Sequence, residues 1–170
     1  MATYIQIGST VTVGAGGAAS ISFSSIPATY TDLILKLSAR TDRSGITQDV
    51  IGIAFNSLTT NLSMRYLQGD GSSASSSSSA SLIWTRADAA TATSNTFGNA
   101  EFYISNYAGS TNKSVSVDGV SENNATEAYA NIVAGLWSSS AAITSIQLTS
   151  ANSANFVQYS TASLYGISKS

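Results

Sequence analysis

The sequence predicts an all-β fold with about eight to ten short antiparallel strands. The main observation is that apolar and polar residues alternate with a period of two along most of the chain, which is typical of strands that bury one face. Clusters of Gly, Asn, Asp and Ser separate these segments at the spacing of a β-sandwich or barrel. The stretches 87–92 and 122–130 predict at most a helical turn or two, because neither has a sustained helical stripe.

The expected strands follow one another along the chain, each with one alternating set of residues assigned to the core. The segment 32–40 is the clearest, since every second residue from Leu33 to Ala39 is apolar. The segment 50–56 is apolar on both faces, which predicts a central strand. Further strands are expected at 62–67, 82–84, 156–159 and 163–167. The other residues assigned to buried faces are Ile5, Ile7, Val11, Val13, Ile21, Phe23, Phe102, Ile104, Val115, Val117, Ile132, Ala134, Leu136, Ile146 and Leu148.

A chain of 170 residues can bury one core, so we expect a single domain over residues 1–170. It begins with an uncharged arm and strand region at 1–31, and the Ser-rich run 71–81 is expected to be an exposed loop. The region 1–31 and the almost uncharged stretch 128–168 are expected to face neighbouring molecules, because their burial would desolvate few charges.

Composition excludes several classes of function. Only 16 residues are charged, 7 basic and 9 acidic, and His and Cys are both absent. This excludes a Ser-His-Asp triad, a Cys nucleophile, disulfides, and metal centres ligated by His or Cys. A net charge of −2 gives no footprint for nucleic acid or an anionic membrane. The 33 Ser and 18 Thr predict a near-neutral hydroxyl surface, which is either covered by neighbouring subunits or reflects a general preference for these residues.

Several motifs resemble sites, but their context favours ordinary turns. Gly14–Ala19 matches the dinucleotide pattern G-x-G-x-x-A, yet a strand is expected after it instead of a helix. Ser110–Lys113 matches Ser-x-x-Lys but lies between strands. The segment 118–124 is either a calcium-binding run of oxygen ligands or a polar turn. No pair of acids is specified for glycoside hydrolysis. We therefore expect no catalytic residue, no cofactor and no metal ligand.

Four aromatic residues are candidates for an interaction site: Trp84, Trp137, Tyr103 and Tyr107. If exposed, their rings would stack on sugars. The other interpretation, that they belong to the core or to a subunit interface, is favoured because the aromatic residues do not gather in one loop.

The run Ser20–Arg40 holds a strand that ends in an Ile-Pro turn and continues through Tyr30-Thr31-Asp32-Leu33 into a long alternating strand. In this it resembles small virion proteins of tailed bacteriophages, especially phages of marine bacteria. The segments Ile53–Asn56, Ile104–Tyr107 and Ser163–Ile167 extend the resemblance to about half of the chain.

The resemblance implies a β-sandwich of jelly-roll type that is part of a virion, either on the head or in the tail. The chain has no fibre shaft and no coiled-coil heptads, which favours a capsid decoration (cement) protein. Such a protein assembles in the host cytoplasm and bridges subunits of the major capsid protein, and we expect it to be a homotrimer. The alternatives are a tail or tail-fibre module that binds a host glycan, and a small hydrolase acting on host polysaccharide. No membrane partner is expected, since neither a secretory signal nor a membrane-spanning run is visible.

Overall fold

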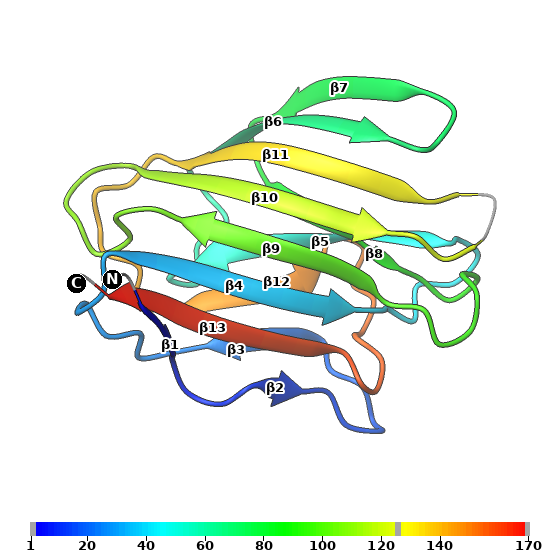
Figure 1. Cartoon of the computed structure of the whole chain (residues 1–170), viewed down its shortest axis with the longest axis horizontal. Helices are drawn as coiled ribbons and strands as arrows, with labels where there is room; N and C mark the ends of the chain where they lie inside the picture. Colours follow the sequence, from blue (N-terminus) through cyan, green and yellow to red (C-terminus); the bar gives the residue numbers. More distant parts are fainter. Residues whose placement is uncertain (1–2, 125–126, 169–170) are drawn as a thin grey trace.

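The computed structural model describes residues 3–124 and 127–168, and these form thirteen strands and no helix. Nine strands make a large sheet, which lies in front in Figure 1. Its order is β1 (Thr3–Gln6), β13 (Thr161–Ser168), β4 (Asp32–Ala39), β9 (Gly98–Ile104), β10 (Lys113–Ser121), β11 (Tyr129–Trp137), β6 (Leu62–Gly69) and β7 (Ala74–Ser79), with β2 (Val11–Thr12) pairing with β13.

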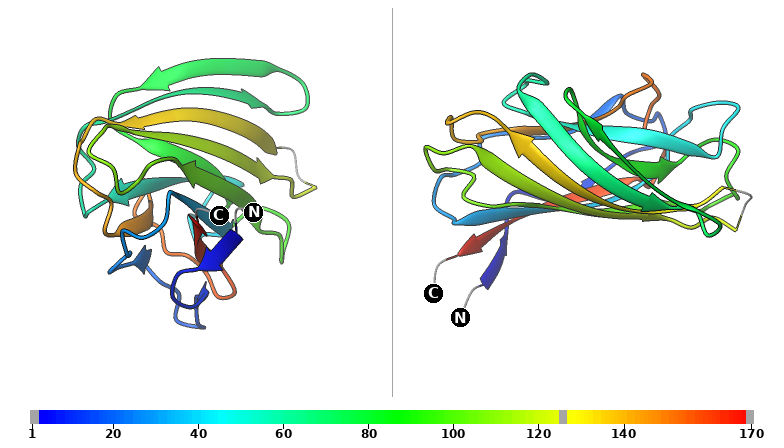
Figure 2. Two further views of the ribbon diagram at one scale, coloured as in Figure 1. Left: turned by 60° about the vertical axis from the view of Figure 1, so that its left-hand side comes forward. Right: turned by 90° about the horizontal axis from the view of Figure 1, so that it is seen from above.

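The other four strands make a small sheet behind the large one, in the order β3 (Ser20–Phe23), β12 (Ile146–Ser150), β5 (Gln48–Phe55) and β8 (Ile83–Asp88). Neighbouring strands are antiparallel in both sheets. The views in Figure 2 show the two layers packed face to face, with β6 and β7 extending beyond the small sheet. The prediction of an all-β sandwich is confirmed, although the described residues form more strands than the expected number.

The core between the sheets comes from the alternation in the sequence. In β4 the predicted face is confirmed, because Leu33, Leu35 and Leu37 are buried while Lys36 is exposed. β5 is central in its sheet, as its two apolar faces predicted, and it lies between β12 and β8. The largest fully buried side chains include Trp137, Tyr107, Phe55, Phe102 and Phe156. One cluster of buried apolar side chains spans both sheets.

In β11 the predicted faces are reversed. Ile132, Ala134 and Leu136 were assigned to the core, but Ile132 is 63% exposed and Ala134 is exposed. The register explains this, because Val133 lies opposite Val117 of β10, and directly opposed residues share one face of a sheet. Both alternating sets of β11 are apolar, so the pattern alone did not decide which set is buried. The buried set includes Trp137, whose ring is larger than any side chain of the exposed set.

The Ser-rich run 71–81 is exposed as predicted, but it is not a loop. Residues Ala74–Ser79 form β7, which pairs with β6 at six positions and makes an edge of the large sheet. Asp70 fixes the turn before it, since its carboxylate accepts hydrogen bonds from the backbone N–H groups of Ser73 (2.7 Å) and Ser72 (2.9 Å). These bonds hold the pKa of Asp70 well below its usual value. The turn at Asp70 therefore brings β7 into pairing with β6, although β7 has no apolar face.

Other segments differ from the sequence predictions in smaller ways. Within the expected N-terminal region 1–31, of which 1–2 lie outside the described residues, β1 and β2 border the large sheet while β3 completes the small one. The stretch 87–92 contains the end of β8 and a turn, with no helical turn. In 122–130 the described residues form a loop and the start of β11. Of the strand expected at 156–159, only the isolated bridges of Phe156 with Ala18 and Thr41 remain.

A buried polar network closes one end of the sandwich. The carboxylate of Asp49 accepts hydrogen bonds from Thr41 (2.9 Å), Ser150 (2.8 Å) and Asn152 (2.8 Å) and pairs with Arg43 at 3.4 Å. A fully buried carboxylate needs such partners to offset its lost hydration. The network therefore ties the loops that follow β4 and β12 to the start of β5.

Candidate functional site on the outer face of the large sheet

The outer face of the large sheet carries exposed apolar side chains over β10, β11 and β6. Ile132 is 63% exposed, Leu67 is 54% exposed and Val120 is 44% exposed. Leu67 lies directly opposite Ile132, and Val120 lies directly opposite Ala130, so these residues are neighbours on one face. We call Leu67, Val120, Ala130, Ile132 and Ala134 the Ile132 patch.

Shallow grooves run beside the Ile132 patch because small residues alternate with large ones. One groove, of about 340 Å³, lies between Leu67, Ala130 and Ile132 and reaches Ala74 of β7. A second groove, also about 340 Å³, lies on the other side of Ile132 and reaches Tyr103. Ile132 is therefore a ridge between two shallow hollows, which is a shape that a complementary protein surface can cover.

The middle of this face carries charges that are mostly paired. Lys36 of β4 and Glu101 of β9 lie opposite each other and form an exposed ion pair of 2.8 Å. The hydrogen bond to Glu101 raises the pKa of Lys36. Asp118 lines the adjoining groove with them. Because the pair is neutral as a unit and exposed, it adds little to stability. Asp118, directly opposite Ile132, forms no ion pair with a described residue and leaves one negative charge on this part of the face.

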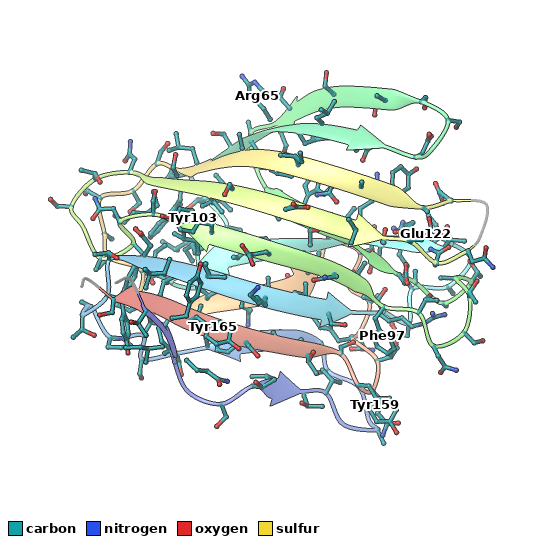
Figure 3. All side chains as sticks on the ribbon, viewed as in Figure 1. Arg65, Phe97, Tyr103, Glu122, Tyr159 and Tyr165 are labelled. Atoms are coloured by element: carbon teal, nitrogen blue, oxygen red, sulfur yellow. The ribbon has the colours of Figure 1, made fainter. Side chains whose placement is uncertain are left out.

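Tyrosine side chains flank the far part of the same face. Tyr103 and Tyr165 lie on either side of Ile34, from β9 and β13, and are labelled in Figure 3. The phenol of Tyr103 donates a hydrogen bond to Asp32 (2.9 Å). Burial, and then this hydrogen bond, raises the pKa of Tyr103. The outer face thus runs from an aliphatic end at β6 to a tyrosine-lined end at β13.

Three of the four aromatic residues predicted as surface candidates are in the interior. Trp137 is 1% exposed and packs on Phe55 at 5.5 Å between ring centroids. Tyr107 is fully buried, and its hydroxyl donates to the backbone carbonyl of Pro27. Trp84 is also buried, with its ring against Tyr66 at 4.8 Å. The interpretation of these three as sugar-stacking surface residues is wrong, since packing covers their ring faces; the core interpretation holds for them.

Tyr103 is the one candidate of the four that the structure leaves on the surface, where it is half-buried. It borders the groove beside Ile132. Ile132 was predicted to be buried, and Leu67 was not predicted as a surface residue. A signal existed for Leu67, because Leu62, Met64 and Tyr66 occupy the inward positions of β6 and Leu67 is out of phase with them.

The remaining motifs are accounted for by local structure. Lys113 of the Ser-x-x-Lys match is buried, and its ammonium donates to the carbonyls of Gly109 (2.7 Å), Thr111 and Ser139 (3.4 Å). Burial lowers the pKa of Lys113. In 118–124, Asp118 and Glu122 are both exposed, and Glu122 accepts a hydrogen bond from the backbone of Asn124. Among residues 3–124 and 127–168, no three acidic side chains are grouped to hold a metal ion.

The fold and this face define a two-sheet antiparallel β-sandwich with a broad, weakly charged outer face. No protein-family model, no curated protein and no solved structure matches the chain. No helix in the described part of the chain is long and apolar enough to cross a membrane.

Proposed function

We propose that this chain is a structural virion protein of a bacteriophage, a capsid decoration (cement) protein whose outer sheet face packs against the head. The observation that carries the proposal is the Ile132 patch. Large apolar residues exposed together on a sheet face mark an interaction surface, because leaving them in water forgoes about 25 cal/mol for each Å² that a partner would cover.

The surface around the patch supports this role. The chain has only 16 charged residues. The charges beside the patch are Asp118, directly opposite Ile132, and Arg65, directly opposite Ala134, while Lys36 and Glu101 form an ion pair. A partner that covers this face therefore desolvates few isolated charges, and desolvation of charge is a main cost of burial. The proposed partner is the major capsid protein, with other virion subunits as further contacts. This function is one of assembly and involves no catalysis.

The strand order supports a jelly-roll connection of the two sheets. Along the chain, β3, β5, β8 and β12 belong to the small sheet, and the strands between them belong to the large sheet. The chain thus crosses repeatedly between the layers, as in double-sheet jelly rolls.

In this role the protein assembles in the host cytoplasm and becomes part of the virion.

We further propose a homotrimer, of about three times 17.4 kDa, that holds several Ile132 patches against the head at once. Multivalent attachment lets individually weak contacts give stable decoration. Light scattering on the purified protein measures this mass directly.

The decisive experiment is co-sedimentation with undecorated heads of the phage that encodes the protein. Wild-type protein is expected to sediment with heads in a fixed ratio to the major capsid protein. The variant Ile132→Lys, which puts a charge at the patch centre, is expected to bind at least about tenfold more weakly.

The matched control is Leu58→Lys, which changes a similarly exposed residue outside the large sheet. It should bind heads as wild type does. If wild-type protein does not bind heads, the decoration role is contradicted, and the tail-module alternative becomes the preferred function. Equal binding by the Ile132 and Leu58 variants contradicts the assignment of the Ile132 patch.

A further inference from the structure

A second surface lies at the end of the sandwich where β4 ends and β13 begins. A groove of about 360 Å³ is lined there by residues that include Arg40, Asn95, Phe97, Gln158 and Tyr159. Figure 3 labels Phe97 and Tyr159 at this end of the molecule. The groove is separate from the Ile132 patch, because it is formed by the loops 90–97 and 157–159 and not by the sheet face.

Tyr159 is the most exposed large hydrophobic side chain of the described residues, at 68%. Its backbone has φ of +73°, a left-handed conformation that costs an aromatic residue free energy. Backbone hydrogen bonds hold this conformation: the N–H of Tyr159 donates to the carbonyl of Val13 (3.0 Å), and the N–H of Val157 donates to the carbonyl of Arg40 (2.9 Å). The fold thus fixes the strained backbone that carries the exposed ring of Tyr159, although packing gains little from this ring.

The opposite wall of the groove is equally fixed. The guanidinium of Arg40 donates hydrogen bonds to the carbonyls of Thr93 (2.7 Å), Ala92 (2.9 Å), Ala90 (3.2 Å) and Thr96 (3.2 Å). This clamps the loop 90–96, which leads directly into Phe97. The backbone that carries the two aromatic residues is therefore held in place before any ligand arrives, which lowers the entropy cost of ordering these loops on binding.

The polar groups of the groove are available to a ligand. Within the described part of the chain, the side-chain amides of Asn95 and Gln158 and the hydroxyl of Tyr159 make no hydrogen bond. Amides donate and accept at once, which suits the hydroxyl groups of sugars. The ring of Tyr159 offers an apolar face on which the C–H groups of a pyranose can pack.

The charge of the groove-lining residues indicates which class of sugar the groove would bind. No carboxylate lines the groove, and Arg40 forms no ion pair with a described residue. Its positive charge therefore favours an anionic ligand. Arg40 already donates through both terminal nitrogens to carbonyls, so it attracts an anion by its charge and not by a bidentate pair of hydrogen bonds. A carboxylated sugar, attracted by charge and held by stacking and amide contacts, fits this groove.

We propose that this groove binds a glycan with a carboxylated sugar, whose pyranose ring stacks on Tyr159 and whose hydroxyl groups bond to Asn95 and Gln158. This site is independent of the decoration role, since it uses different residues. It gives the protein an adhesive function that does not depend on attachment to the head.

The test uses saturation-transfer NMR with four probes: trigalacturonic acid, 3′-sialyllactose, and the neutral trisaccharides cellotriose and maltotriose. An acidic probe is expected to bind, more tightly than the neutral ones and more weakly at high salt. The variant Tyr159→Gly removes the ring at a position where glycine relieves the backbone strain. It should unfold at the same or a higher temperature than wild type, yet lose at least tenfold in affinity.

The control Tyr4→Ala removes another exposed tyrosine, at 58% exposure, from β1 of the large sheet. It should leave glycan affinity unchanged. If no acidic probe binds, or if binding survives in the Tyr159→Gly variant, the proposal is wrong. Head binding by the Tyr159→Gly variant is expected to equal that of wild type, so failure here is distinguishable from failure of the decoration role.

Discussion

Gly135 of β11 allows the two sheets to approach each other, and an alanine there tests the packing directly. A Cβ added to Gly135 would lie 2.7 Å from Cδ1, 2.9 Å from Cγ1 and 3.1 Å from Cγ2 of Ile83 in β8. Carbon atoms prefer separations of about 3.5–4.0 Å, so Ile83 would have to retreat by about 1 Å. Ile83 is fully buried, and β8 is paired with β5, so neither moves freely.

The expected loss of stability follows from this overlap. Overpacking of a core costs about 1–3 kcal/mol. The lower entropy of an unfolded chain with Ala in place of Gly returns about 0.4–1 kcal/mol. From the middle of these two ranges we expect Gly135→Ala to lower the free energy of unfolding by about 1–2 kcal/mol, and Tm by about 2–8 °C. Urea unfolding at equilibrium and scanning calorimetry measure the two quantities.

Two comparisons isolate the contact between Gly135 and Ile83. Gly16→Ala is the matched control, because no atom lies within 4 Å of its added Cβ, and it should leave stability unchanged or slightly higher. Ile83→Val removes the nearest overlapping atom, so the double variant should lose less than the sum of the two single losses by about 0.5 kcal/mol or more. The reasoning is refuted if Gly135→Ala is as stable as Gly16→Ala, or if the two losses simply add.

Two further predictions concern the core and the polar end of the sandwich. Trp137→Ala should destabilise the fold by about 3–5 kcal/mol, because it empties a buried site beside Phe55. A variant that unfolds in urea at the same midpoint as wild type would contradict the burial of the Trp137 ring. Hydrogen bonds from Thr47 (2.7 Å) and Tyr129 (2.9 Å) hold the pKa of Glu127 below its usual value of 4.5. The ionised carboxylate therefore stabilises the fold above pH 4.5. This stabilisation is lost as the pH falls through the folded-state pKa of Glu127. Glu127→Gln should therefore unfold at a lower temperature than wild type at pH 7, with a difference that shrinks between pH 5 and pH 3; a difference independent of pH would contradict this assignment.

The candidate surfaces were only partly visible in the sequence. Composition indicated a weakly charged surface suited to contact with neighbours, and the region 128–168 expected to face them does contain Ile132. The residue itself was assigned to the core, because a strand with two apolar sets does not reveal which set faces outward. Phe97 was in no predicted strand, and Tyr159 was placed in a strand expected at 156–159 that is a loop in the structure. Loops bring the two residues to one groove across more than 60 residues of chain, which no local pattern predicts.

The sequence by itself determined the all-β class, the inward face of β4 and the central place of β5, because local alternation is the direct record of a strand that buries one or both faces. Only the tertiary structure decided the face of β11, the burial of Trp84, Trp137 and Tyr107, and the strand made by five consecutive serines. Each of these depends on register with a neighbouring strand or on packing across the two sheets. Those are relations between residues distant in the chain, and no short-range pattern contains them.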